Sequence, residues 1–155
     1  TTIRKKNKNT YNMYTMKNEN VKLKKSQSGL GLFALRDFKK GEMIVEYTGE
    51  KITEEEANRR GGKYLFELND EWTIDGKGRE NLARYINHSC KPNCSPELDE
   101  DEEHIFIYAK KNIKAGEELV YNYGKMYFNE LIGKAGCTCI SCTEKREKES
   151  EVTSS

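Results

Sequence analysis

The sequence predicts a mostly β fold made of small sheets with few short helices. Short apolar or alternating runs recur along the chain, and turns that contain glycine separate them. The sequence has no strand–helix–strand repeat, which argues against a parallel α/β sheet. A length of 155 residues suits one domain with a small core, together with a short appended module.

The hydrophobic pattern places the expected elements in order along the chain. Alternating or apolar runs predict strands at residues 21–24, 32–35, 43–47, 64–68, 72–74, 104–109 and 119–121. The strands at 64–68 and 72–74 are expected to form a hairpin. A capping box that starts at Thr53 predicts a short helix that ends before Gly61. Residues 81–86 suit one helical turn, and clusters of glycine and serine predict turns, of which the first spans residues 26–31.

Composition divides the chain into four expected parts. Residues 1–18, rich in Lys, Asn and Thr, read as a flexible basic tail. Residues 19–125 form the main domain, residues 126–145 a cysteine-containing segment, and residues 146–155 a charged, disordered tail. The 27 Lys and Arg residues nearly balance 26 Asp and Glu residues, so net charge gives no reason to bind nucleic acid or membrane. No apolar run approaches the roughly 20 residues of a membrane helix.

The five cysteines have a spacing that indicates a metal site. Cys137, Cys139 and Cys142 lie within six residues, and three thiolates so close together can share one Zn²⁺. A structural zinc site needs a fourth ligand, which must come from Cys90 or Cys94. The alternative is a set of free thiols in a loose tail. An odd, clustered set is less typical of a disulfide framework.

Arg84 to Cys94, read as Arg-Tyr-Ile-Asn-His-Ser-Cys-Lys-Pro-Asn-Cys, is the most informative segment. Its amide, imidazole and thiol groups need partners when buried, so this density indicates a site. A structural role for His88, as a simple hydrogen-bonded residue, remains open. A Cys–His protease dyad is disfavoured, because His88 lies two and six residues from Cys90 and Cys94 and nothing nearby supplies an oxyanion hole.

Three weaker features accompany this segment. Ser28, Gly29, Leu30 and Gly31 hold a pair of glycines that lets the backbone approach a ligand, although most such pairs are ordinary turns. The tyrosines in the predicted strands are equally consistent with core packing. The acidic run at residues 97–103 is expected at a solvated hairpin tip, with attraction of a basic peptide as the alternative.

Taken together, these segments resemble SET-domain protein lysine methyltransferases, in the order in which that family carries them. The opening Gly-Leu-Gly-Leu-Phe-Ala, the Glu-Tyr-x-Gly-Glu motif, the hairpin around Ile-Asp-Gly, the Asn-His-Ser-Cys signature and the Glu-Glu-Leu-Val-Tyr-Asn-Tyr segment all match. The cysteine cluster resembles a post-SET zinc module, with a shorter final spacing than many members have. The compact size is similar to that of viral and microbial members.

The resemblance implies a fold and a set of site residues. The fold is a SET domain of small β-sheets. In it, the signature segment (residues 84–94) and residues 119–124 cross as a pseudoknot. S-adenosylmethionine would be held by Ser28, Gly29, Leu30, Gly31, Tyr64, Arg84, Asn87 and His88. Tyr47, Tyr121 and Tyr123 would line the lysine channel, with Tyr123 central to catalysis and Tyr121 favouring mono-methylation. A structural Zn²⁺ would be bound by Cys90, Cys137, Cys139 and Cys142.

The implied function is methyl transfer from S-adenosylmethionine to a lysine of a basic peptide, by default a histone tail, in the nucleus or on chromatin. This reaction needs alignment and a neutral amine rather than a covalent intermediate. The basic tail at residues 1–18 is a candidate for a weak contact with nucleosomal DNA. The alternative is a catalytically weak SET fold that binds peptide or nucleic acid.

Overall fold

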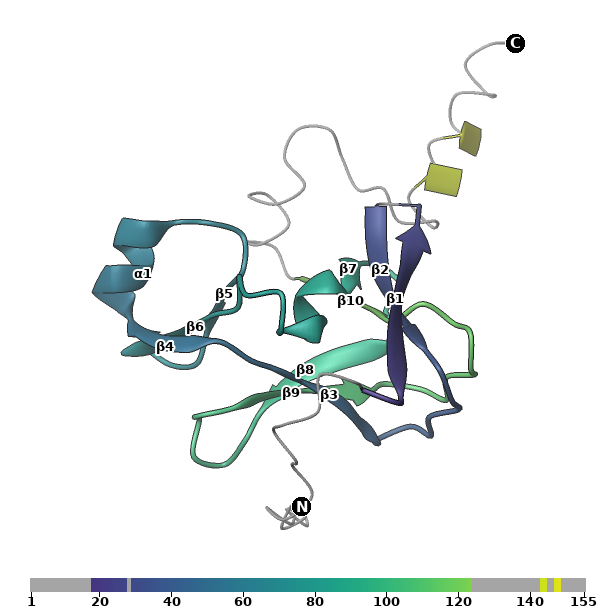
Figure 1. The fold of residues 1–155 in the computed structure, drawn as a ribbon, viewed down its shortest axis with the longest axis horizontal. Coiled ribbons are helices and arrows are strands. Elements are labelled where there is room, and N and C mark those ends of the chain that lie inside the picture. Colours follow the sequence, from purple (N-terminus) through teal and green to yellow (C-terminus); the bar gives the residue numbers. More distant parts are fainter. Residues whose placement is uncertain (1–17, 28, 124–142, 145–146, 149–155) are drawn as a thin grey trace.

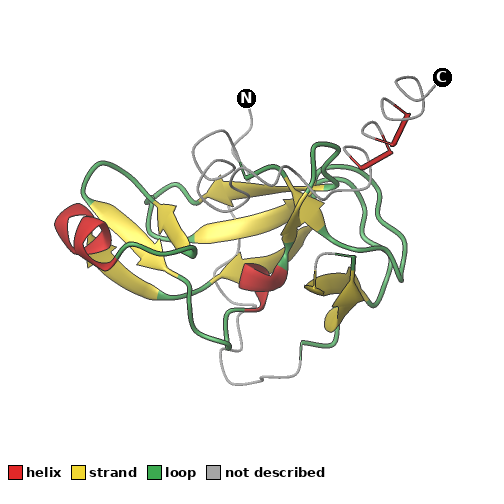
Figure 2. Ribbon diagram, turned by 90° about the horizontal axis from the view of Figure 1, so that it is seen from above, coloured by secondary structure: helices red, strands yellow, loops and turns green. Residues whose placement is uncertain are grey.

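A computed structural model describes residues 18–27, 29–123, 143–144 and 147–148. Within this part the strands form four small sheets, with the orders β1-β2, β3-β9-β8, β4-β6-β5 and β10-β7 (Figures 1 and 2). The strands are β1 Val21–Ser26, β2 Gly29–Ala34, β3 Met43–Tyr47, β4 Glu50–Thr53, β5 Leu65–Glu67, β6 Trp72–Asp75, β7 Asn87–His88, β8 Cys94–Leu98, β9 Ile105–Ala109 and β10 Val120–Tyr121. The predicted mostly β architecture of small sheets is confirmed.

The helix predicted from Thr53 is present as α1, Glu54–Arg60. The Thr53 hydroxyl accepts from the Glu56 amide at 3.1 Å, which is the first half of the capping box. The Glu56 carboxylate contacts Arg59 and Arg60. Gly61 ends the helix with a φ of 59°, a conformation that glycine adopts without strain. The expected turn at residues 81–86 is the 3-10 helix η2, Leu82–Tyr85.

The prediction of a turn over residues 26–31 is wrong in its second half. Gly29 to Gly31 belong to β2, and the hairpin register pairs Ser26 with Gly29. The sequence analysis also missed β4, β7 and β8. Their residues are too polar, too few or, with Pro96 in β8, too poor in β-propensity to show an alternating pattern. β8 lies at a sheet edge, where a proline is tolerated.

The buried core lies between β2, the β3-β9-β8 sheet and η2. Its fully buried large side chains include Leu32, Phe38, Ile86, Ile107 and Leu119. The acidic run lies at the turn between β8 and β9, as expected for a solvated hairpin tip. No helix in the described residues is long and apolar enough to span a bilayer.

The predicted crossing of two segments is built around β10. β7 and β10 pair in parallel, with Asn87 opposite Val120, and the Ser89 amide donates to the Tyr121 carbonyl at 3.1 Å. On the other edge of β10, the Asn93 amide donates to the Val120 carbonyl, and the Asn93 side chain accepts from the Val120 amide at 2.9 Å. Residues 87–93 therefore bond to both edges of β10. This arrangement fixes Tyr123, two residues after β10, beside the signature segment.

Candidate active site

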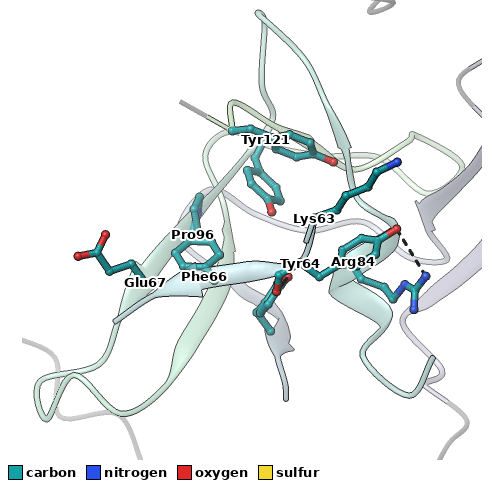
Figure 3. A pocket seen from close by; sticks show the side chains of 9 residues that line it. Lys63, Tyr64, Phe66, Glu67, Arg84, Pro96 and Tyr121 are labelled. Atoms are coloured by element: carbon teal, nitrogen blue, oxygen red, sulfur yellow. Dashed lines mark hydrogen bonds between the residues drawn. The ribbon is translucent and has the colours of Figure 1, made fainter. Parts of the chain in front are cut away.

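A cavity of about 180 Å³ lies where the β4-β6-β5 sheet, β8 and β10 meet (Figure 3). It is lined by Tyr47, Lys63, Tyr64, Phe66, Glu67, Arg84, Pro96, Tyr121 and Tyr123. Aromatic rings make most of its wall, while Lys63 and Arg84 lie on one side and Glu67 on the other (Figure 3). The cavity thus combines an apolar wall with charges at separate places on its rim.

Tyr123 is held at two points by the signature segment. Its amide donates to the His88 Nδ1 at 3.1 Å, and its hydroxyl donates to the Ile86 carbonyl. The centre of its ring lies 4.9 Å from the centre of the Tyr121 ring, and its ring makes an edge contact with the His88 ring. Burial is the main cause that raises the pKa of Tyr123 above its ordinary value. The hydroxyl is therefore a protonated donor at neutral pH and not a base.

Tyr47 is a further part of the cavity wall. It is only 5% exposed, and its hydroxyl donates to the Tyr64 carbonyl at 2.8 Å. The ring of Phe66 lies 5.3 Å from its ring. The structure thus brings Tyr47, Tyr121 and Tyr123, which were predicted to line one channel, into one cavity.

Asn87 joins β2, here called the glycine strand because it holds Gly29 and Gly31, to the signature segment. The two N–H groups of its side chain are shared among three acceptors, namely the Leu30 carbonyl at 3.1 Å, the Ser26 hydroxyl at 3.1 Å and the Glu118 carboxylate at 2.9 Å. A Cβ on Gly31 would meet the Glu118 carboxylate, so a larger residue here would have to displace that side chain from Asn87. The predicted grouping of Gly29, Leu30 and Gly31 with Asn87 is therefore present. Ser28, from the same prediction, lies outside the described residues.

Arg84 and Tyr64 form one unit in the cavity wall. The Arg84 guanidinium lies 4.3 Å from the Tyr64 ring centre and 5.0 Å from that of Tyr85, and it donates to the Lys77 carbonyl. We predicted both residues as part of the cofactor group. The structure places them beside Tyr47 and Tyr123, on the tyrosine side of the site.

The surroundings of His88 favour a neutral ring with its proton on one particular nitrogen. Burial lowers its pKa, which favours the uncharged form. Because Nδ1 accepts from the Tyr123 amide, the proton of the neutral ring lies on Nε2, which is 3.5 Å from the Cys90 sulfur. His88 thus orients Tyr123 through one nitrogen and faces Cys90 through the other.

The two described cysteines differ in their surroundings. Cys90 is exposed, whereas Cys94 is buried in the core, where burial raises its thiol pKa from 9.0 to about 12. A zinc ligand must be a thiolate, so an accessible thiol fits this role better than a buried neutral one. Cys137, Cys139 and Cys142 lie outside the described residues. Among residues that are described, no three His, Cys, Asp or Glu side chains group as a metal site.

Several cavity and support residues were not predicted. Lys63, Phe66, Glu67 and Pro96 line the cavity because strand edges distant in sequence meet there, and no local pattern signals this. Glu118 and Asn93 lie within motifs that the sequence analysis noted, yet their roles depend on their non-local partners. Asn93, next to Cys94 in the signature, had a usable signal as a buried amide in a dense polar segment.

The SET domain, as a protein family, matches residues 29–124. This match covers more than half of the chain and includes the crossing, the tyrosine cavity and the glycine strand. The chain therefore belongs to the SET-domain family.

The chain is similar to several named members of that family. The chain is 41% identical over 131 residues to histone-lysine N-methyltransferase trr of Drosophila melanogaster, covering 77% of this chain and 5% of the relative. It is 41% identical to histone-lysine N-methyltransferase 2D of Homo sapiens, over 77% of this chain and 2% of the relative. A Schizosaccharomyces pombe enzyme named as H3 lysine-4 specific is 39% identical, over 71% of this chain and 13% of the relative. The chain thus spans a small part of each relative's length.

Solved structures show the same fold. The Chaetomium thermophilum polycomb repressive complex 2 contains a chain that matches with a TM-score of 0.62 and 41% identity. That match covers 68% of this chain and 15% of the other. An active polycomb repressive complex 2 in the stimulated state matches with a TM-score of 0.63, 41% identity and the same coverage.

Proposed function

We propose that this chain is an S-adenosylmethionine-dependent protein-lysine N-methyltransferase that acts on a lysine of a histone tail. The observation that carries the proposal is the tyrosine cavity, in which His88 holds one of the lining tyrosines, Tyr123. Tyr47, Tyr121 and Tyr123 enclose it, and His88 fixes the last of these. The family and the names of the relatives support the same reaction and the same class of substrate.

The residues near the glycine strand fit the methyl donor. Gly29 has a φ of 103° and open space where a side chain would stand, so a ligand can approach the backbone there. The Asn87 amide fixes the adjoining Leu30 carbonyl at 3.1 Å. We assign Ser28, Gly29, Leu30, Gly31, Asn87 and His88 to this cofactor, with Tyr64 and Arg84 bordering it. When bound, S-adenosylmethionine supplies an electrophilic methyl group.

The cavity suits a lysine side chain that must lose its proton. The four methylenes of lysine pack against aromatic rings, while the amine reaches the hydroxyl groups. A dry aromatic environment disfavours the ammonium form and lowers the lysine pKa from its ordinary value of about 10.4. Tyr123 remains protonated, so its role is to orient the amine and not to remove the proton. The acidic Glu67 at the rim is available to a basic flanking residue.

We further propose a structural Zn²⁺ bound by Cys90, Cys137, Cys139 and Cys142. Three of these lie outside the described residues, so the support is their spacing together with the exposure of Cys90. A zinc ion there would hold the C-terminal segment next to His88 and the cavity. A histone substrate implies a location in the nucleus or on chromatin. A contact of the basic tail with DNA remains a hypothesis from sequence.

The proposed function is tested with a methyl donor labelled in its methyl group and a mixture of core histones. Wild-type protein should label a histone lysine, which mass spectrometry would locate. Tyr123→Phe should lower the rate by about 100-fold or more, because the hydroxyl that orients the amine is lost. Tyr108→Phe is the matched control, a buried tyrosine in β9 that does not line the cavity. Peptide binding without methyl transfer by the wild type would contradict the proposal.

A further inference from the structure

We propose that Arg60 and Asp75 are positioning residues for the tyrosine cavity. Arg60 lies at the end of α1 and does not line the cavity. It holds the buried Asp75 carboxylate, and through it the turn at residues 75–77 that supports Tyr47 and Tyr64. The kinetic part of this inference rests on the proposed function, whereas its structural part does not.

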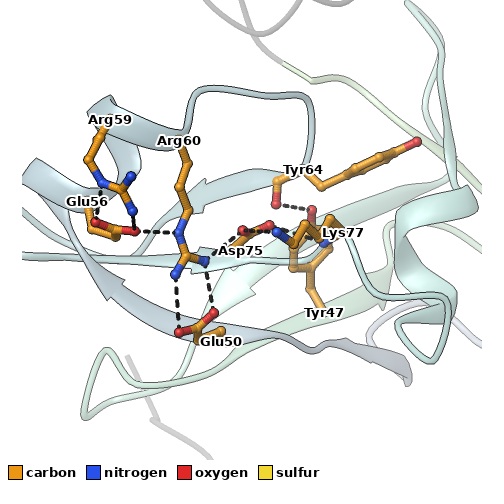
Figure 4. Close-up of polar contacts among 8 residues, drawn as sticks. All are labelled: Tyr47, Glu50, Glu56, Arg59, Arg60, Tyr64, Asp75 and Lys77. Carbon is orange, nitrogen blue, oxygen red and sulfur yellow. Dashed lines mark hydrogen bonds and ion pairs between the residues drawn. The ribbon is translucent and has the colours of Figure 1, made fainter.

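Arg60 binds carboxylates from three elements (Figure 4). Its Nη1 lies 2.8 Å from the Glu50 carboxylate of β4 and 3.1 Å from the Asp75 carboxylate of β6. Its Nε lies 2.8 Å from the Glu56 carboxylate within α1. These hydrogen bonds, with that to Glu50 the largest cause, raise the pKa of Arg60 further above its ordinary value. The guanidinium is therefore a permanent cation at this junction.

Of the three carboxylates, only that of Asp75 is buried. Its side chain is 6% exposed, against 63% for Glu50 and 28% for Glu56. Exposed ion pairs contribute little, whereas a buried carboxylate that loses its partner is strongly unfavourable. The ammonium of Lys77 also approaches Asp75, but at 3.8 Å and from a side chain that is 72% exposed. Arg60 is thus the main counter-ion of the Asp75 carboxylate.

Asp75 starts a turn that contacts the cavity wall directly. Its carboxylate accepts from the Lys77 amide at 3.3 Å, and the Gly76 amide donates to the Tyr64 carbonyl at 2.8 Å. The Tyr47 hydroxyl donates to that same carbonyl at 2.8 Å. Any side chain on Gly76 would collide with the Tyr47 ring, so the turn lies flat against it. A shift of the turn therefore moves both tyrosines.

The turn also reaches the second part of the wall. The Lys77 carbonyl accepts from Arg84, which stacks on the Tyr64 ring. In contrast, the Asn87 side chain bonds to Ser26, Leu30 and Glu118, none of which belongs to the turn. Loss of the Arg60–Asp75 pair should therefore disturb the lysine cavity, including its Tyr64 and Arg84 wall, while the part of the methyl-donor site that Asn87 holds at β2 keeps its geometry. That separation distinguishes positioning from general destabilisation.

The decisive comparison uses Arg60→Leu with Arg59→Leu as its matched control. Arg59 is the neighbouring arginine of α1, is 73% exposed, and contacts only Glu56 among the described residues. Arg60→Leu should lower kcat for a histone peptide about tenfold or more, because small displacements at a reacting centre are costly. The Kd for S-adenosylhomocysteine should change by less than kcat does, because the turn reaches that site only through Tyr64 and Arg84. Arg59→Leu should stay within about twofold of wild type in both quantities.

A double variant distinguishes two causes of a lower kcat in Arg60→Leu: the unpaired charge on buried Asp75, and the lost bond between α1 and β4. Asp75→Asn removes the charge and keeps an oxygen that accepts from the Lys77 amide. Arg60→Leu/Asp75→Asn should therefore regain about threefold or more in kcat over Arg60→Leu alone. If Arg60 acts only by tying α1 to β4 through Glu50, that bond remains broken in the double variant and no recovery occurs.

A readout that needs no turnover completes the test. Protein labelled with 3-fluorotyrosine gives ¹⁹F resonances for Tyr47 and Tyr64, assigned with their phenylalanine variants. Both resonances should move in Arg60→Leu, stay in place in Arg59→Leu, and return toward wild type in the double variant. Unmoved resonances, or a kcat equal to that of Arg59→Leu, would overturn the inference.

Two further outcomes are also informative. If the wild type transfers no methyl group, the proposed function fails, and the ¹⁹F spectra alone judge the positioning of the tyrosines. If Arg60→Leu does not fold, Arg60→Lys takes its place, since lysine keeps the charge but cannot bridge several carboxylates at once. A kcat for Arg60→Lys within about twofold of wild type, with unmoved resonances, would then overturn the inference.

Discussion

Asn93→Ala should destabilise the protein strongly, because this side chain closes the crossing around β10. Asn93 is 6% exposed. Its side-chain nitrogen donates to the Glu118 carbonyl at 2.8 Å, and its oxygen accepts from the Val120 amide at 2.9 Å. Alanine removes both bonds and leaves two backbone groups without these partners.

The expected loss follows from these two groups. A buried polar group that loses its partner costs about 1–3 kcal/mol. Glu118 and Val120 are only partly buried, so the lower part of that range applies to each. The free energy of unfolding should fall by about 2–4 kcal/mol, a large share of the roughly 5–15 kcal/mol of an ordinary domain.

Urea denaturation followed by circular dichroism measures this change, with Asn112→Ala as the control. Asn112 is exposed, and its side chain accepts from the Lys40 amide at 3.0 Å. Its loss should cost about 0.5 kcal/mol, as is usual for surface positions. The slope with denaturant should be unchanged in both variants, which indicates a change in stability alone. A loss for Asn93→Ala no larger than that for Asn112→Ala would refute the reasoning.

Three further outcomes are expected. Tyr121→Phe should shift products from mono-methyl toward di- and tri-methyl-lysine, because it removes an oxygen that crowds the amine or holds a water. An unchanged product distribution in mass spectra would count against this role. Reduced protein should contain one zinc per chain by elemental analysis, lost in Cys90→Ser and kept in Cys94→Ser; the reverse pattern would reassign the ligand. Burial raises the Cys94 thiol pKa from 9.0 to about 12, so the unfolded chain loses this proton at a lower pH than the folded protein does. The free energy of unfolding should therefore fall as the pH rises from 9.0 to about 12. Cys94→Ala should reduce that alkaline slope, and an equal slope would argue against a buried neutral thiol.

Local pattern was sufficient for the elements that carry their own signal. β3 was predicted with its observed bounds, and β1 and β9 within two residues, because apolar side chains recur at the strand period. α1 followed from the Thr53 cap and Gly61. The order of the motifs was also enough to indicate the family, which the match to the SET domain confirms.

Tertiary structure alone decided the elements and contacts that depend on distant partners. β7 has two residues and becomes a strand only because it pairs with β10, 33 residues away along the chain at Asn87 and Val120, although β10 itself was predicted at residues 119–121. The cavity wall takes Pro96 from β8 and Phe66 from β5, two strand edges that no local pattern brings together. Likewise, Arg60 appears in sequence as one charge at a helix end, and only the fold gives it the buried Asp75. The sequence by itself thus determined the residue types and the order in which the motifs occur, since these are local. Their mutual positions required the fold, because they are set by hydrogen bonds and packing between residues far apart along the chain.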